Sequence, residues 1–254
     1  MAFYNYLKYD FRSASDRKFV ARRLVQLKKQ LDKEIPKKDT ETNLLIGTWN
    51  IRDFGKSNRR GFGKRTKDSL YYIAEIISAF DIVAVQEVNE LEEWSKVMKI
   101  LGPSWAYIAT DVSDSNAGGN GERMTFVYDT RKVWFKNIAG EIVLPNSLLI
   151  STSELTSSDD KLVTGKQFRR TPYIVSFQSG WFKFDLCTVH IYYGRGSDGL
   201  AQRIKEIETI AKYLSDRVDK KLKKERKATI LLGDFNIIRP DHDTMNALEN
   251  NGFV

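Results

Sequence analysis

The chain has 254 residues, of which 41% are hydrophobic and 29% are charged. This length suits one large domain or two small ones, and no apolar run approaches the ~18 residues that a membrane-spanning helix needs. The first residues form neither an apolar core nor a small-residue cleavage site, so no secretory signal is predicted. The single cysteine, Cys187, excludes an internal disulfide and is expected to be a small core residue. A cytoplasmic protein without a membrane partner is therefore expected.

The charge balance is basic, because 41 Lys and Arg residues against 33 Asp and Glu residues give a net charge of +8. A polyanion such as nucleic acid gains from such a field through the release of counterions. The charge is spread along the chain rather than confined to one stripe. It therefore raises the expectation of a nucleic-acid partner only modestly.

The N-terminal segment 1–43 is expected to be a basic amphipathic helix over 15–35 followed by a linker. Apolar side chains recur there at helical spacing among many lysines and arginines. Ser13 or Ser15 could cap the start of the helix, and Pro36 follows its end. The helix most simply packs its apolar stripe on the domain that follows, although it could also lie on nucleic acid or another partner.

From residue 44 onward, apolar runs of strand length alternate with amphipathic helices, and a series of short aromatic and β-branched runs follows. The segment 146–167 is expected to be a surface excursion. Strands are expected over 44–51, 81–88, 105–112, 124–130, 133–144, 173–179, 182–193 and 228–237, and helices over 69–80, 89–101 and 200–225. The pattern predicts a layered α/β sandwich, in which sheets pack together with helices outside.

Polar residues stand at the ends of four strands that are otherwise apolar. They are Asn50, Glu87, His190 and the pair Asp234 and Asn236. A rigid sheet can hold such side chains at fixed spacing above a cleft. A carboxylate and an amide offer the oxygen ligands that Mg²⁺ prefers, and a histidine can move a proton near neutral pH. Each residue alone also suits a helix start, a core or a turn, so only the set points to a site.

The same residues lie in an ordered series of motifs, which reads TWNIR, DIVAVQEV, GERMTFVY, TVHIYYG and LLGDFNI. The series resembles the endonuclease/exonuclease/phosphatase superfamily, which has the deoxyribonuclease-I-like fold, from about Leu44 to Ile238. The resemblance implies a domain over 44–254 with a four-layer α/β (α+β) sandwich of two packed, mostly antiparallel sheets flanked by helices. It also implies a phosphodiester hydrolase that uses Mg²⁺, with Mn²⁺ or Ca²⁺ as substitutes.

The resemblance implies a role for each residue at these positions. Glu87 matches the principal metal-binding glutamate, and Asn50 matches the asparagine beside it. His190 matches a histidine that lies against the scissile phosphate and donates a proton. Glu122 matches the glutamate that orients this histidine, a pairing that would fix the imidazole tautomer.

Further matches concern the attacking water and the phosphate. Asp234 and Asn236 match the pair that positions the water and holds the phosphate, in an in-line attack that needs no covalent intermediate. Arg170 falls where deoxyribonucleases place an arginine on the phosphate, and Arg169 is an immediate competitor for that role.

A basic loop over 56–67 follows the first of these motifs, with six lysines and arginines among its twelve residues. It could contact the phosphate backbone or be a solvated loop, and the sequence leaves both open. Arg52, Lys64 and Arg65 are the residues in or beside it that we expect to bind substrate.

The superfamily pattern continues past the LLGDFNI motif with further strands and a final Ser-Asp-His motif, which this sequence lacks. Asp241 and His242 imitate its last two residues, but the segment 241–251 is predicted to be a capped helix start instead. Truncation, a partner fragment or a degenerate relative would each explain the difference. Loss of the general base predicts activity lower by ~10²–10⁴-fold.

The preferred function is a nuclease acting on DNA rather than RNA. A phosphatase of inositol phosphates or other small phosphoesters stays open, as does a catalytically silent module that binds nucleic acid. The basic charge favours a polymer, the missing final motif favours the silent module, and the intact set of polar residues argues against it. The sequence does not indicate which oligomeric state the protein adopts.

Overall fold

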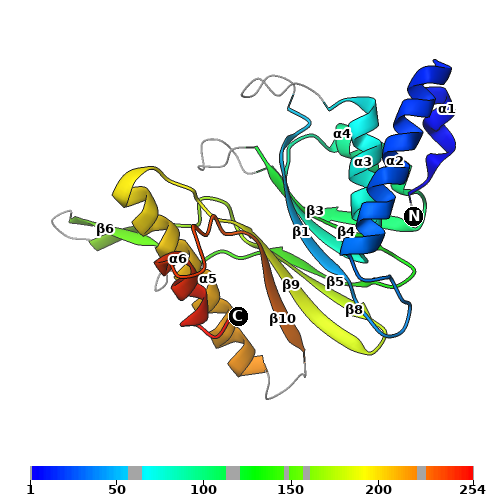
Figure 1. The fold of residues 1–254 in the computed structure, drawn as a ribbon. Helices are drawn as coiled ribbons and strands as arrows, with labels where there is room; N and C mark the ends of the chain where they lie inside the picture. Colours follow the sequence, from blue (N-terminus) through cyan, green and yellow to red (C-terminus); the bar gives the residue numbers. More distant parts are fainter. Residues whose placement is uncertain are drawn as a thin grey trace. The chain divides into compact units, whose positions relative to one another are not determined.

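The computed structural model describes residues 2–56, 65–112, 121–145, 149–156, 161–221 and 227–253. The chain divides into two compact units. Unit 1 comprises Met1–Asp111 and Glu122–Trp134, and unit 2 comprises Val112–Gly121 and Phe135–Val254. Each unit is built on one four-stranded sheet with its own helices (Figure 1).

The sheet of unit 1 is mixed, with strand order β1-β2-β4-β3. β1 and β2 are parallel, whereas β4 is antiparallel to both β2 and β3. A helix, α3, connects the two parallel strands, as a parallel crossover requires. The elements of unit 1 are η1 (Tyr4–Tyr6), α1 (Leu7–Asp10), α2 (Ala14–Glu34), β1 (Ile46–Phe54), α3 (Lys67–Ser78), β2 (Ile82–Val88), α4 (Leu91–Leu101), β3 (Trp105–Ala109) and β4 (Arg123–Asp129).

One apolar cluster fills unit 1 and includes the N-terminal helix. Trp94 of α4 and Val85 of β2 are fully buried in it, and Val20 and Leu24 of α2 belong to the same cluster. The apolar stripe of α2 therefore packs on the rest of unit 1, as its spacing predicts. Ser13 caps the helix by accepting hydrogen bonds from backbone N–H groups of the first turn.

The segment between α2 and β1 is held by buried ion pairs rather than being a free linker. The ammonium of Lys38 lies 3.3 Å from Asp81 and 3.5 Å from Asp129. Asp81 is fully buried and also pairs with Lys132 at 2.8 Å. Removal of one partner of such a pair would destabilise the fold, because it leaves an uncompensated buried charge. A domain boundary after residue 43 stays a prediction.

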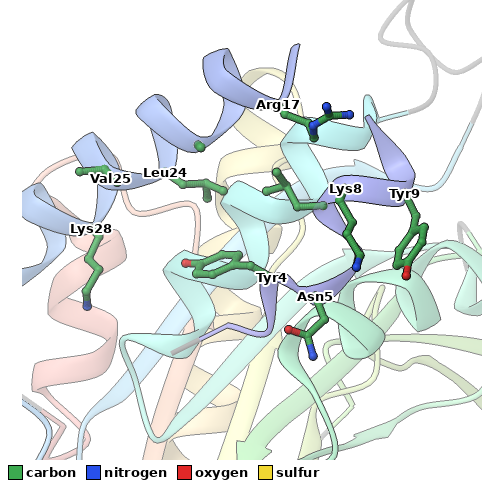
Figure 2. A pocket seen from close by; sticks show the side chains of 10 residues that line it. Tyr4, Asn5, Lys8, Tyr9, Arg17, Leu24, Val25 and Lys28 are labelled. Atoms are coloured by element: carbon green, nitrogen blue, oxygen red, sulfur yellow. The ribbon is translucent and has the colours of Figure 1, made fainter. Parts of the chain in front are cut away.

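A groove of about 680 Å³ lies between the N-terminal turn and α2 (Figure 2). Leu7 and Leu24 form part of its apolar lining, and Lys8, Arg17 and Lys28 bring positive charge to it. None of the residues predicted for the functional site lines this groove.

The sheet of unit 2 is also mixed, with strand order β10-β9-β8-β5. β9 and β10 are parallel, and β8 and β9 are antiparallel. The elements of unit 2 are β5 (Trp134–Glu141), β6 (Ser151–Thr156), β7 (Lys161–Lys166), β8 (Tyr173–Ser179), β9 (Phe182–His190), α5 (Gly196–Lys221), β10 (Ala228–Asp234) and α6 (Asp243–Glu249).

The core of unit 2 joins β9 to α5 and α6. Val189 of β9, Ile207 and Ile210 of α5 and Leu248 of α6 belong to one buried cluster. Cys187 lies in the same cluster with no exposed surface, and burial raises the pKa of its thiol well above the usual range. The prediction that Cys187 is a core residue is confirmed.

The main departure from the expected elements is in the segment 146–167. It contains an antiparallel pair of strands, β6 and β7, where the sequence predicts only a surface excursion. Polar residues such as Ser and Thr obscure the strand pattern there, and cross-strand pairing decides it. No helix in the described part of the chain is long and apolar enough to cross a membrane. The predicted fold of mostly antiparallel sheets flanked by helices is confirmed, and each four-stranded sheet also contains a parallel pair of strands, β1 with β2 and β9 with β10.

Candidate active site

In unit 1, the predicted pair Asn50 and Glu87 is brought together at the ends of two parallel strands. The side-chain amide of Asn50 donates a hydrogen bond of 3.0 Å to Oε1 of Glu87. The backbone N–H of Asp53 donates to Oε2 at 2.6 Å, so both carboxylate oxygens accept a bond. Oδ1 of Asn50 accepts from the backbone of Arg52 at 2.9 Å. Asn50 therefore orients Glu87, and its role as a metal ligand stays a prediction.

Irregular backbone aims these side chains. The register of β1 shifts against β2 between Asn50 and Phe54, and β2 shifts against β4 around Glu87. Arg52, Asp53 and Glu87 adopt positive φ values of 57°, 48° and 65°. Non-glycine residues pay roughly 1–2 kcal/mol for this conformation, so surrounding contacts must hold it in place. Bulges re-aim side chains beside functional sites, and here they present the Glu87 carboxylate at the strand end.

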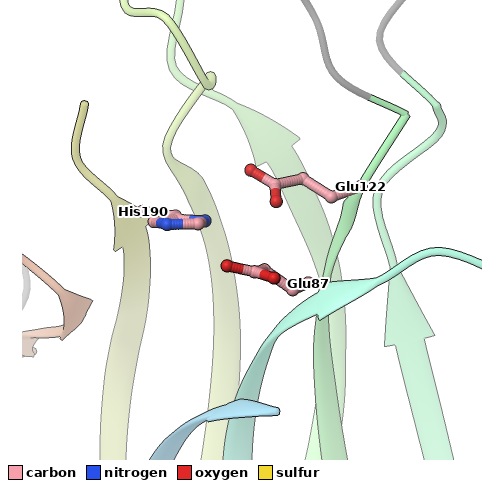
Figure 3. Close-up of side chains that lie close together, drawn as sticks. All are labelled: Glu87, Glu122 and His190. Atoms are coloured by element: carbon pink, nitrogen blue, oxygen red, sulfur yellow. The ribbon is translucent and has the colours of Figure 1, made fainter. Parts of the chain in front are cut away.

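A second carboxylate lies close to Glu87. Glu122 precedes β4, and a carboxylate oxygen of each residue lies within 4.8 Å of the other (Figure 3). Two carboxylates at this spacing repel each other unless a cation or a proton is shared between them. Hard carboxylate oxygens suit Mg²⁺, which commonly uses one or two of them and keeps several waters. The donor set of unit 1 therefore fits a divalent cation.

Arg65, in the basic loop 56–67, is hydrogen-bonded to the end of β1. Its Nη2 donates to the backbone carbonyls of Ile51 at 2.6 Å and Arg52 at 2.8 Å. The carbonyls of the irregular segment gain a partner in this way. Lys64 lies outside the described residues, as does most of the basic loop. Substrate binding by Arg52, Lys64 and Arg65 stays a prediction.

In unit 2, His190 and Asp234 stand in register at the ends of β9 and β10. Nε2 of His190 lies 3.8 Å from Oδ2 of Asp234, and the histidine side chain is only 5% exposed. His190 is drawn at the end of its strand in Figure 3. The other oxygen, Oδ1, accepts the backbone N–H of Asn236 at 2.9 Å. The spacing allows a protonated imidazole to pair with the carboxylate.

Asn236 is held from two sides. Its side-chain amide donates to the carbonyl of Ile191 at 2.8 Å, and its own carbonyl accepts from Nη1 of Arg203 at 3.0 Å. Its φ is +52°, which asparagine tolerates better than most residues. Three predicted residues, His190, Asp234 and Asn236, are therefore assembled within unit 2.

Two buried ionic residues of α5 support this assembly, and the sequence-based predictions missed both. Arg203 is 4% exposed and also donates from Nε to the carbonyl of Tyr193 at 2.9 Å. Glu206 is 1% exposed and accepts the backbone N–H of Tyr192 at 3.1 Å. Both stand where the apolar stripe of the helix continues towards its N-terminus. A charged residue on an apolar stripe indicates a buried, paired charge, and this pattern could have identified both residues from the sequence.

Glu206 also connects to the predicted phosphate arginines. It accepts the backbone N–H of Arg169 at 3.4 Å, while the guanidinium of Arg169 lies over the ring of Tyr192 at 5.5 Å. Burial raises the pKa of Glu206, and the charge of Arg170 is among the interactions that oppose this. Arg170 is thus the half-buried member of the pair and Arg169 the exposed one. Contact of either residue with phosphate stays a prediction.

No protein-family model matches the chain, and no curated protein does. Solved structures do match. An endonuclease/exonuclease/phosphatase family protein from Bacteroides thetaiotaomicron is 20% identical with a TM-score of 0.53, over 83% of this chain and 70% of that one. One from Bacteroides vulgatus is 19% identical with a TM-score of 0.52, over 84% and 73%. The human Nocturnin catalytic domain, solved with a bound sulfate, is 12% identical with a TM-score of 0.50, over 80% and 68%.

The chain has the endonuclease/exonuclease/phosphatase fold. The resemblance inferred from the order of motifs is confirmed at the level of the fold. Within it, the predicted residues form two sets, one at the strand ends of unit 1 and one at those of unit 2. The predicted pairing of Glu122 with His190 joins residues of different units and stays a prediction.

The predicted helix start after LLGDFNI is confirmed, and His242 caps it. It stands at the N-cap of α6, where its Nδ1 accepts the backbone N–H of Thr244 at 3.1 Å. The segment 241–251 therefore begins a capped helix, and the absence of a catalytic role for His242 stays a prediction.

Replacing Gly233 by Ala is expected to damage the His190 and Asp234 pair. Gly233 has φ +140°, and a Cβ there would lie 2.1 Å from the carbonyl oxygen of Val189. This backbone atom has little freedom to move, so β9 and β10 must separate just before Asp234. We expect a loss of at least ~1–3 kcal/mol in the free energy of unfolding, measured by urea denaturation. An unchanged midpoint would contradict this, and Gly140→Ala, with open space around its Cβ, is the control.

Proposed function

We propose that the chain is a metal-dependent phosphodiester hydrolase that cleaves nucleic acid. The observation that carries the proposal is the pair of carboxylates within 4.8 Å of each other, with Glu87 at the bulged end of β2 and Glu122 directly before β4. Asn50 and the backbone of Asp53 keep Glu87 oriented for binding. Such a preorganised, acidic site costs stability through repulsion and strain, which a bound cation offsets.

Glu87 and Glu122 would hold the metal ion, for which Mg²⁺ is the proposed choice and Mn²⁺ or Ca²⁺ the substitutes. When bound, such an ion supplies stabilisation of the negative charge that develops on phosphoryl oxygens. Arg170 and the side-chain amide of Asn236 are proposed to contact the phosphate oxygens as well.

The proton transfers are assigned to the second set of residues. Asp234 would orient a water and accept its proton while the water oxygen forms a bond to phosphorus. His190 would donate a proton to the ester oxygen as its bond to phosphorus breaks, so that an alcohol and a phosphate monoester leave. Nε2 of His190 and Oδ2 of Asp234 lie 3.8 Å apart, so the proton that Asp234 accepts would have a short path back to His190. That both sets of residues serve one reaction follows from the superfamily resemblance and is part of the proposal.

DNA is the proposed substrate, rather than RNA or a small phosphoester, and the cytoplasm the proposed location. The net charge of +8 favours a polymer of phosphates over a single phosphate group. The test is nicking of supercoiled plasmid by the purified chain, with Mg²⁺ and with EDTA. Nicking only with Mg²⁺ supports the proposal. Release of phosphate from inositol phosphates without plasmid nicking would replace it with the phosphatase.

A further inference from the structure

A second pocket of unit 1, of about 410 Å³, lies among the N-terminal turn and the helices α3 and α4. Its lining is rich in cations: Arg65, Lys67, Lys96 and Lys99. None of the contacts assigned above to metal binding or proton transfer involves its lysines. The pocket is therefore a candidate site for an anionic ligand of its own.

The two carboxylates in the lining are already engaged. Asp10 accepts a hydrogen bond from the hydroxyl of Tyr71 at 2.7 Å. Glu93 pairs with Lys96 at 2.6 Å on α4. Four cations against two occupied carboxylates leave the pocket with net positive charge, which favours phosphate groups.

The pocket cations are held in place by local contacts. The ammonium of Lys99 lies 4.2 Å from the ring centre of Tyr6, and that of Lys67 donates to the carbonyl of Asp10 at 3.4 Å. These contacts reduce the entropy that the long side chains would lose on binding. Tyr6 is 37% exposed, so its aromatic ring also offers surface to a base.

Arg65 connects this pocket to the candidate metal site. The guanidinium that lines the pocket also holds the carbonyls of Ile51 and Arg52, directly after Asn50. Lys96 and Lys99 lie on α4, which begins four residues after Glu87. The pocket lining includes neither Glu87 nor Glu122, so a ligand that reaches both the pocket and the candidate metal site must carry more than one phosphate group.

We propose that this pocket binds phosphate groups of a nucleic-acid strand other than the phosphate whose bond is cut. The inference rests on the proposed function and deepens it, because it assigns the substrate as a polymer. The chemistry is electrostatic contact with the strand backbone, so it is independent of base sequence.

The test uses the double variant Lys96→Ala/Lys99→Ala, with Lys18→Ala/Lys33→Ala as a matched control. The control removes the same charge from exposed positions of α2 outside the pocket. KM is measured with Mg²⁺ for a long single-stranded oligonucleotide and for bis(p-nitrophenyl) phosphate. We expect KM for the oligonucleotide to rise roughly tenfold in the pocket variant alone, and the slope of log affinity against log salt to fall by about 1.4. KM for the small diester should not change.

Equal changes with both substrates, equal changes in the control, or no change at all would overturn the inference. Binding of the labelled oligonucleotide in EDTA, followed by fluorescence anisotropy, separates the inference from the proposed function. If the chain cleaves neither substrate, the proposed function fails. The pocket assignment then stands if the pocket variant binds the strand about tenfold more weakly than the control does, and falls if both bind alike.

Discussion

Glu87→Gln is expected to lower Mg²⁺-dependent hydrolysis by at least ~10²-fold while the fold is retained. The amide has the shape of the carboxylate and keeps an oxygen that can accept from Asn50 or Asp53. It lacks the charge that would bind a cation together with Glu122. A bound metal ion contributes several kcal/mol of charge stabilisation in the transition state. Each 1.36 kcal/mol that is lost lowers the rate about tenfold.

The measurements for this variant are kcat at increasing Mg²⁺ and the heat of Mg²⁺ binding to the protein alone. Glu92→Gln, at an exposed position in the first turn of α4, removes the same charge nearby and is the control. Thermal unfolding of both variants checks the fold. If Glu87→Gln binds Mg²⁺ and turns over like the unsubstituted chain, Glu87 is not the metal ligand.

His190→Ala is expected to lower kcat by ~10²–10⁴-fold with a smaller effect on KM, because a proton donor acts mainly in the transition state. Added imidazole should restore part of the rate by occupying the space that the side chain leaves. His190→Gln tests whether size alone matters, since the native side chain is almost fully buried. Full activity in either variant would remove His190 from the mechanism.

The chain has 2 histidines, so His242→Ala is a natural control. It should lose about 1 kcal/mol of stability with the N-cap of α6 and keep its activity. The double variant Glu87→Gln/His190→Ala tests whether both sets of residues serve one reaction. Its loss should then be close to that of one single variant, as for groups that act as a unit. Losses that multiply would assign the two residues to independent contributions.

Much of the fold and the candidate site could be predicted from local patterns in the sequence. Helical spacing and a serine cap locate α2 within one residue at each end, and β8 occupies the predicted range 173–179. Asn50, Glu87, His190 and Asp234 were identified because polar residues interrupt apolar runs where strands end. This information is local, since it depends on periodicity and on the chemistry of a few adjacent residues.

The precise arrangement of the site depended on tertiary structure. The bulges that give Arg52, Asp53 and Glu87 positive φ arise from register between strands distant in sequence, which no local pattern encodes. Arg203 and Glu206 interrupt the apolar stripe of α5, but only the folded chain brings them to the backbone of Asn236 and Tyr192.

The sequence by itself determined the order of the strands of both four-stranded sheets along the chain, the core position of Cys187 and the chemistry available at the strand ends. Tertiary structure alone decided that Lys38 is tied to Asp81, that Gly233 must pass close to Val189 and that Lys99 shares a pocket with Arg65. The physical reason is the same in each case. Burial, close approach and pairing of charges depend on residues that the chain brings together only when it folds.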